Sequence, residues 1–301
     1  EALLNAGIEV AGVVTAPDRP AGRGQVPRMS AVKEFAIARP ELRDRVLQPE
    51  KLKDPAFHAA LDALAASLYV VVAFRMLPEA VWARPARGTI NLHASLLPDY
   101  RGAAPINWAI INGEERTGVT TFFIRHEIDT GDIIGTEAVM IGSEETAGEL
   151  HDRLMRTGAA LLVRTVSDIL AERATSSPQR ISMGAEVHHA PKLTPAIARI
   201  DWSRSVKRVH DHIRGLSPHP GAWTTWSQQG VVQQFKVLRC RIAANERTAS
   251  PGTVIIIEQR MLVRCADGWL EALEVQPENK RRMEAAAFIR GLRSTDDIIL
   301  S

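Results

Sequence analysis

Apolar and polar positions alternate in blocks along the first 170 residues. Short runs rich in β-branched side chains are separated by stretches with a helix-like pattern. The apolar runs cover 8–14, 68–73, 89–93 and 118–124, and the helix-like stretches cover 30–38, 55–65 and 105–111. Runs with almost no polar interruption favour strands that are buried on both faces, as in a parallel sheet. This alternation predicts an open α/β sheet.

One long helix is expected at the end of this first part. Thr146 and Glu149 have the spacing of a capping box, and Leu, Ile and Val then recur at helical period up to residue 170. The next stretch is rich in Ser, Pro, Gly, Thr and His and has no period. We therefore predict a helix over 143–172 and an inter-domain linker over 174–195.

Short strand-like runs broken by turn residues dominate the rest of the chain. They cover 231–241, 253–258, 261–265 and 269–275, and helix-like patterns cover 203–214 and 281–292. Such spacing predicts a small antiparallel barrel. The expected organisation is a first domain over 1–173, the linker over 174–195, and a β-barrel domain over 196–301.

Composition narrows the class of protein. Of 301 residues, 45% are hydrophobic and 24% are charged, which is ordinary for a globular chain and excludes a disordered or fibrous one. No apolar stretch approaches the roughly 20 residues that a membrane span needs, so we expect no membrane partner. Two cysteines are too few for a disulfide framework, so we expect a reducing, cytoplasmic location.

The net charge of +2 conceals an uneven distribution. Residues 191–301 carry 17 Lys and Arg against 11 Asp and Glu, whereas residues 1–190 carry 20 against 24. The C-terminal part is therefore +6 and the N-terminal part −4. A basic part joined to an acidic one fits contact with a polyanion or a merely uneven surface, and charge alone favours neither.

Candidate chemistry lies at the C-terminal end of the strand predicted over 89–93, where ligand crevices of open α/β sheets lie. Asn91 and His93 are two residues apart, so their side chains point to the same side of an extended strand. An amide donor beside an imidazole can polarise a carbonyl and move a proton. Asp129, on a Gly-containing loop, could orient the imidazole. Each residue alone is more often structural, and spacing does not say that the three converge.

Two separated motifs resemble the signature of the folate-dependent formyltransferases: Asn91-x-His93-x-Ser95-Leu96-Leu97-Pro98-x-x-Arg101-Gly102-x-x-Pro105, and Asp129-Thr130-Gly131-Asp132. The resemblance covers nearly the whole chain. The segments at Thr15–Gly24, Lys192–Trp202 and Gln276–Met283 resemble the members that act on methionyl-tRNA. This implies a Rossmann-like, mostly parallel sheet followed by a smaller, OB-like β-barrel.

The resemblance implies transfer of the formyl group of 10-formyltetrahydrofolate to the α-amino group of methionine on initiator tRNA. In that reaction Asn91 would donate a hydrogen bond to the oxyanion, and His93 would take or return a proton. Asp129 would orient His93, together with a water. No metal is expected, because a neutral amine is already a nucleophile. We expect the chain to act as a monomer.

The resemblance also implies a slot for the pterin ring of the folate. Its expected lining is Val71, Val72, Ala73, Phe74, Met76, Leu77, Ser95, Leu96, Leu97 and Pro98. Because side chains alternate between the faces of a strand, about half of the apolar positions on the strand itself would be ordinary sheet core instead.

Basic residues in two places are candidates for contact with tRNA. One group, interleaved with Gly and Pro, consists of Arg19, Arg23 and Arg28, and the resemblance implies that Arg23 enters the acceptor stem. The other group consists of Lys207, Arg208, Lys280, Arg281 and Arg282. A solvated loop and scattered surface charge are the respective alternatives.

Other functions would share Asn91, His93 and Asp129. They are formyl transfer to an amino sugar on a nucleotide, and hydrolysis of 10-formyltetrahydrofolate. A catalytically silent RNA-binding protein is a further alternative. The basic loop and the basic C-terminal part favour tRNA as the formyl acceptor.

The sequence begins at Glu1 with no Met and no signal-peptide pattern. The resemblance implies a first strand before the helix that ends near Gly7, so we expect that strand to be missing from this sequence.

Overall fold

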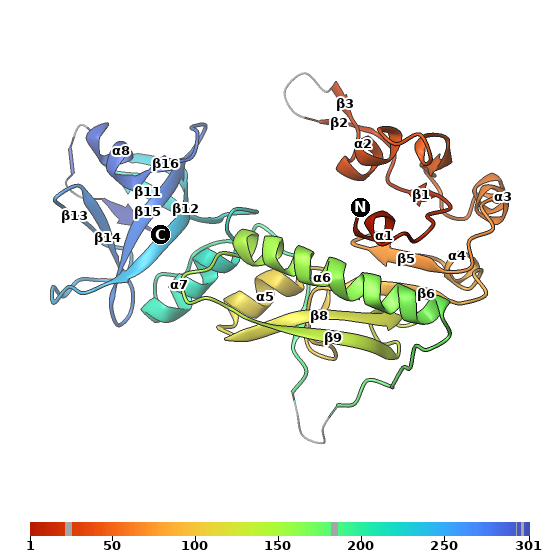
Figure 1. Ribbon diagram of the computed structural model, residues 1–301. Coiled ribbons are helices and arrows are strands. Elements are labelled where there is room, and N and C mark those ends of the chain that lie inside the picture. Colours follow the sequence, from red (N-terminus) through yellow and green to blue (C-terminus); the bar gives the residue numbers. More distant parts are fainter. Residues whose placement is uncertain (22–25, 182–185, 293, 296–297) are drawn as a thin grey trace. The chain divides into compact units, whose positions relative to one another are not determined.

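The computed structural model describes residues 1–21, 26–181, 186–292, 294–295 and 298–301 (Figure 1). They form two compact units, and each is described by itself. The first unit comprises Glu1–His93, Val119–Glu137 and Thr157–Arg180, and the second comprises Ala94–Gly118, Ala138–Arg156 and Ile181–Ser301. The domain boundaries expected at residues 173 and 195 stay a prediction.

A sheet of four strands runs through the first unit, in the order β5 (Tyr69–Val72), β6 (Thr89–His93), β8 (Arg116–Phe123) and β9 (Ile133–Met140). Strands β5 and β6 are parallel, whereas β6 and β8 are antiparallel. A second parallel pair joins β1 (Val13–Val14) to β4 (Val46–Leu47). The expected α/β sheet is confirmed, with one difference: β8 and β9 follow each other through a short loop, which suits antiparallel pairing and leaves no room for a helical crossover.

The remaining elements of this unit are short, apart from one helix. They are α1 (Ala2–Asn5), the hairpin of β2 (Arg19–Ala21) and β3 (Val26–Arg28), α2 (Ala31–Ile37), η1 (Arg43–Arg45), α3 (Pro55–Ala63), α4 (Glu79–Trp82) and the long α6 (Ala147–Leu170). The part of α6 before Thr157 belongs to the second unit. The capping box of α6 is confirmed, since the Thr146 N–H donates to Glu149 Oε2 at 2.9 Å and the Glu149 N–H donates to Thr146 Oγ1 at 3.3 Å. The apolar run over 8–14 becomes strand only at Val13–Val14.

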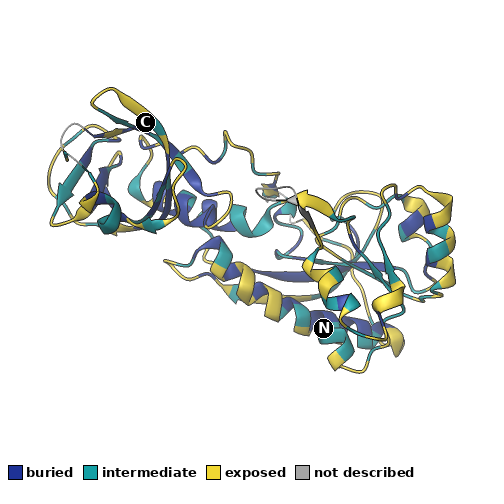
Figure 2. Ribbon diagram, turned by 90° about the horizontal axis from the view of Figure 1, so that it is seen from above, coloured by how far each residue is buried: buried dark blue, intermediate teal, exposed yellow. Residues whose placement is uncertain are grey.

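Both faces of the sheet are covered by helices. On one face, Ile90 packs with Leu162 and Val166 of α6. On the other, Tyr69 packs against the core of α3 and α4 around Phe57. Figure 2 shows α6 buried along one side and exposed along the other, as its amphipathic pattern predicts. The sheet is therefore a middle layer, and its strand ends are the part left for chemistry.

The second unit contains a curled antiparallel sheet. Its strands are β11 (Ala222–Gln228), β12 (Val231–Ala243), β13 (Val254–Ile257), β14 (Arg260–Arg264), β15 (Trp269–Pro277), β16 (Met283–Glu284) and β17 (Ile299–Leu300). Their order is β13-β14-β15-β12-β11-β17, with β16 beside β15, and a bridge between Thr253 and Ile299 links the two ends. The rings of Trp226, Phe235 and Phe288 meet in its core. The expected barrel-type domain is thereby confirmed.

The helix expected over 281–292 is shorter in the structure. It is α8 (Ala285–Arg290), because Met283 and Glu284 pair with β15 as β16. The other helices of this unit are α5 (Pro105–Ile111) and α7 (Val206–Gly215), which pack together where Gly215 meets Ile111. None of the helices among the described residues is long and apolar enough to span a membrane.

Candidate active site

Strand β6 carries Asn91 and His93 on one face. The alternate residues Ile90 and Leu92 pack in the core formed with α6, so the side chains of Asn91 and His93 point to the opposite face. Asn91 is partly buried, and His93 is buried next to Thr120 of β8 in the register of the sheet. Asn91 and His93 therefore lie on the same side of the strand, as their spacing predicts.

Asp129 reaches His93 from the loop between β8 and β9. His93 Nδ1 and Asp129 Oδ2 lie 3.8 Å apart, within ion-pair range for a protonated ring but longer than a hydrogen bond. The two side chains are only 7% and 12% exposed. A carboxylate this close to a shielded imidazole is placed to act on the ring in proton transfer.

The loop that carries Asp129 has an unusual backbone. Asp129 has a φ of +55°, in the left-handed region that non-glycine residues seldom adopt. A Cβ on Gly131 would lie 1.6 Å from the carbonyl oxygen of Phe123, so only glycine fits there. The carbonyl groups of Asp129 and Gly131 both accept hydrogen bonds from Gln179 Nε2, at 2.8 and 2.9 Å. Sequence analysis missed Gln179, because a lone amide in an aperiodic segment belongs to no catalytic motif.

Residues 95–102, which continue the motif that begins at Asn91, lie in the second unit and are held by residues 188–190. Ser95 is fully buried and its Oγ donates to the Asp99 carbonyl at 2.6 Å. Strand β7 (Arg101–Gly102) pairs with β10 (His189–Ala190). A Cβ on Gly102 would lie 2.5 Å from the carbonyl oxygen of Ala190, which explains the glycine after Arg101. In the same segment, His188 stacks on Tyr100 with ring centres 5.3 Å apart.

The expected folate residues differ in exposure. Val72 is 50% and Met76 is 73% exposed, and Ala73 is exposed with a φ of +47°. Phe74 and Leu77 instead pack against the core around Phe57. The remaining residues are intermediate or buried: Val71, Leu96 and Pro98 are intermediate, and Ser95 and Leu97 are buried. Exposed apolar side chains after a strand end suit a flat ligand, so Val72 and Met76 are the strongest of these candidates.

The expected tRNA residues divide by their partners. Arg19 and Arg28 are exposed and face each other in the β2–β3 hairpin, whereas Arg23 lies outside the described residues. In the second unit, Lys207 pairs with Asp211, and Arg282 with Glu274. The other three predicted tRNA residues of this unit, Arg208, Lys280 and Arg281, are exposed and have no ion pair within the described parts of the chain.

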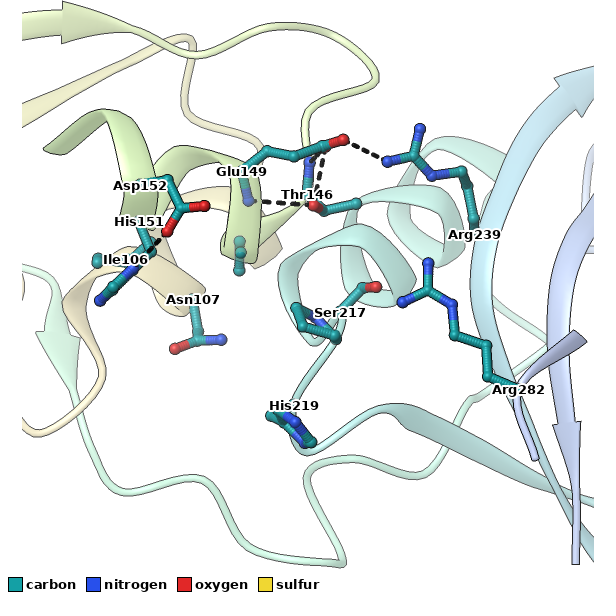
Figure 3. Close-up of a pocket in the computed structure, with 13 residues that line it drawn as sticks. Ile106, Asn107, Thr146, Glu149, His151, Asp152, Ser217, His219, Arg239 and Arg282 are labelled. Atoms are coloured by element: carbon teal, nitrogen blue, oxygen red, sulfur yellow. Dashed lines mark hydrogen bonds and ion pairs between the residues drawn. The ribbon is translucent and has the colours of Figure 1, made fainter. Parts of the chain in front are cut away.

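A pocket of about 540 Å³ lies in the second unit, at the first turn of α6 (Figure 3). Its lining includes Asn107, His219, Arg239 and Arg282. Figure 3 shows Arg239 reaching Glu149, to which it donates a hydrogen bond. Arg282 is paired in turn with Glu274, so the arginines on this pocket are already neutralised. Asn91, His93 and Asp129 are not part of it.

The described residues contain no ready set of side chains for binding a metal ion. No group of three or more His, Cys, Asp or Glu side chains among them is arranged to hold an ion. Both cysteines, Cys240 and Cys265, are free and buried.

The arrangement of Asn91, His93 and Asp129 on this sheet agrees with two matches to known families. The formyl transferase profile matches residues 2–166, and the profile of the formyl transferase C-terminal domain matches residues 192–293. Together they cover most of the chain. The chain therefore belongs to the formyl transferase family.

Curated proteins similar to this chain include methionyl-tRNA formyltransferases. The protein from Bacteroides fragilis (strain YCH46) is 44% identical over 299 residues, which are 98% of this chain and 91% of that protein. The protein from Parabacteroides distasonis is 45% identical over 297 residues, 97% of this chain and 91% of that protein. At this identity and coverage the similarity includes both halves of the chain.

Solved structures support the fold. HypX from Aquifex aeolicus in complex with tetrahydrofolic acid aligns with a TM-score of 0.64 at 17% identity, covering 96% of this chain and 50% of that one. The N-formyltransferase from Helicobacter canadensis, in complex with folinic acid and dTDP-3-aminofucose, aligns with a TM-score of 0.57 at 16% identity. The alignment covers 89% of this chain and 100% of that one. Identities this low show a shared fold only.

Proposed function

We propose that this chain transfers the formyl group of 10-formyltetrahydrofolate to the α-amino group of methionyl initiator tRNA, the reaction that prepares the first residue for translation. The observation that carries the proposal is the approach of Asp129 to His93, beside Asn91 on the same strand. Its relatives named methionyl-tRNA formyltransferases are similar to it over almost the full length, and this similarity supports the choice of acceptor.

The reaction needs charge stabilisation and one proton relay. The neutral amine attacks the formyl carbon, and the carbonyl oxygen becomes a tetrahedral oxyanion. The side-chain amide of Asn91 donates a hydrogen bond to that oxyanion, a contact typically worth about 3–4 kcal/mol of the barrier. His93 accepts the proton that the amine loses and returns it to N10 of the folate as the bond from carbon to N10 breaks. Asp129 stabilises the protonated ring during this relay.

The burial of the site suits this mechanism. His93 and Asp129 are shielded from water, and shielding strengthens their interaction. The exposed side chains of Val72 and Met76 offer an apolar surface at the end of the neighbouring strand, which suits a pterin ring. The reaction requires no metal, because attack by an amine needs only positioning and a stabilised oxyanion.

The acceptor is argued from charge. The C-terminal part of the chain is +6. Its exposed cations without an ion pair among the described residues include Arg208, Lys280 and Arg281. A polyanion is attracted by such a surface over a long range. The hairpin cations Arg19 and Arg28 belong to the acidic part and give it a local site for phosphate.

Cellular context follows from the same proposal. Two buried free thiols suit a reducing compartment, so we place the reaction in the cytoplasm, where charged tRNA is available. We propose a monomer as the working form.

A comparison of acceptors tests the proposal. The purified chain is incubated with 10-formyltetrahydrofolate and, in separate reactions, methionyl initiator tRNA, a dTDP-amino sugar or no acceptor. We expect formyl-methionyl-tRNA, with a kcat/KM at least about 10³-fold above that of the amino sugar, because an acceptor lacking most of the binding contacts loses their free energy. A preference for the amino sugar, or equal release of tetrahydrofolate without an acceptor, would contradict the proposal.

A further inference from the structure

The segment after α6 contacts the loop that carries Asp129. Residues 174–181 have no sequence period, and most of them are exposed. Gln179 is partly buried between the exposed neighbours Pro178 and Arg180. We infer that Gln179 is a positioning residue, which holds Asp129 in the conformation that acts on His93. The inference rests on the catalytic role proposed above for Asp129.

The hydrogen bonds of Gln179 are matched to the loop. Its Nε2 donates to the carbonyl oxygen of Asp129 at 2.8 Å and to that of Gly131 at 2.9 Å. A side-chain amide nitrogen has two N–H groups, so each carbonyl can accept one of them. With the amide turned round, its oxygen would face two acceptors, and the contacts therefore fix its orientation.

These two carbonyl groups flank the strained part of the loop. Asp129 has a φ of +55°, a conformation that persists only where the surroundings hold it. Two further contacts fix the loop on its other side: the Phe123 N–H donates to the Asp132 carbonyl at 3.0 Å, and Arg125 pairs with Asp132 at 2.6 Å. Gln179 reaches the Asp129 end of this turn.

Gln179 is itself anchored through the backbone. Ile133, the first residue of β9, and Ser177 form an antiparallel bridge. The Ile133 N–H donates to the Ser177 carbonyl oxygen at 2.8 Å, and the Ser177 N–H donates to the Ile133 carbonyl oxygen at 2.9 Å. The segment is therefore fixed to the sheet two residues before Gln179, so the amide can restrain the loop instead of moving with it.

Loss of this restraint would affect catalysis through the distance between Asp129 and His93. His93 Nδ1 and Asp129 Oδ2 lie 3.8 Å apart, and the carboxylate follows its own backbone. Without Gln179 the loop loses this restraint, and relaxation of Asp129 toward the right-handed region redirects its side chain. A displacement of about 1 Å at a catalytic group can lower turnover by roughly 100-fold.

The test is a double-mutant cycle with Asp129. Gln179→Met keeps the length and packing of the side chain and removes the donor, and Gln179→Ala removes both. We expect each variant to lower kcat for formylation at least about tenfold while the KM values for folate and tRNA stay within about twofold. In an Asp129→Ala enzyme the same substitutions should change kcat by less than about twofold, because residues that act as a unit are not additive.

A merely structural role would give a different result. It would lower the melting temperature and reduce kcat by the same factor in both backgrounds, and that additivity would overturn the inference. Ser176→Ala, at an exposed neighbour, is the matched control and should leave kcat unchanged. Normal turnover of Gln179→Met beside a slow Asp129→Ala enzyme would overturn this inference alone. Normal turnover of Asp129→Ala would overturn the proposed role of Asp129 as well.

Discussion

His93 Nδ1 and Asp129 Oδ2 lie 3.8 Å apart although the two residues belong to different segments, one at the end of β6 and the other in the loop after β8. The sheet register alone does not bring them together. His93 is opposite Thr120 in the middle of β8, whereas β8 ends at Phe123, which is opposite Ile90 near the start of β6. The loop after β8 therefore has to turn back toward the end of β6 before its carboxylate can approach the imidazole.

Gly131 should tolerate no side chain. In Gly131→Ala the new Cβ would lie 1.6 Å from the carbonyl oxygen of Phe123, and a backbone group cannot rotate away. We expect a loss of about 2–3 kcal/mol in the free energy of unfolding, and a lower kcat, because the loop must move. Urea denaturation measures the first effect. Gly291→Ala is the control, since its Cβ would make an ordinary 3.4 Å contact. Equal stability of the two variants would contradict this account.

Asp211 should contribute to stability in a pH-dependent way. Burial alone would raise the pKa of this carboxyl, but hydrogen bonds from His210, Lys207 and Arg214 lower it to about 2 from 3.8. A lowered folded-state pKa stabilises the protein above the unfolded pKa, and the effect is lost as pH falls from about 4 toward 2. We expect Asp211→Asn to cost about 2 kcal/mol at pH 7.

The measurement for Asp211 is the difference in unfolding free energy between the wild type and Asp211→Asn. This difference should shrink when the pH falls from 4 to 2.5. Asp152→Asn, at an exposed carboxyl on α6, is the control and should show a much smaller difference at either pH. A difference for Asp211→Asn that stays constant over that range would contradict the assigned role.

The two thiols should be unreactive in the native protein. Burial raises the pKa of Cys240 and raises that of Cys265 to about 12, and the thiolate is the reactive form. We expect almost no reaction with Ellman's reagent at pH 8 in the folded state, and two thiols per chain after denaturation in guanidinium. Rapid native-state reaction of either cysteine would show that the core of the curled sheet opens easily.

Replacing Arg281 should change the salt dependence of tRNA binding more than replacing the ion-paired Arg282. Arg281 is exposed, whereas the neighbouring Arg282 is paired with Glu274. Arg281→Ala should lower the slope of log K against log salt by about 0.7–0.9, the value for one phosphate contact. Arg282→Ala should change it less. Filter binding of methionyl-tRNA between 50 and 200 mM salt measures both. Equal slopes for the wild type and Arg281→Ala would remove Arg281 from the tRNA surface.

Local patterns predicted the elements that carry the site. Alternation along β6 placed Asn91 and His93 on one side, because a strand has a period of two whatever surrounds it. The capping box of Thr146 and Glu149 fixed the start of α6 for the same local reason. Helix α8 was predicted too long, because pairing of Met283 with β15 is a long-range interaction that no helical period reveals.

The support of the site could not be predicted from sequence. The contact of Gln179 with the Asp129 loop joins positions that are distant along the chain, and neither residue type signals it. Gly102 gives a similar case, since its requirement for glycine comes from the approach of Ala190. Likewise, sequence counted Lys207 and Arg282 as available cations, and only the structure shows their carboxylate partners.

Steady-state formylation of methionyl initiator tRNA by the wild type, Asn91→Ala and His93→Ala tests the central claim most directly. Asp152→Asn is the control, since it alters an exposed carboxyl on α6 that the account places outside the catalytic site. The account predicts robust formylation by the wild type and the control. It predicts a kcat lowered at least about 100-fold in Asn91→Ala and His93→Ala, from the loss of an oxyanion donor and of the proton relay. Near-normal turnover in either variant would contradict it.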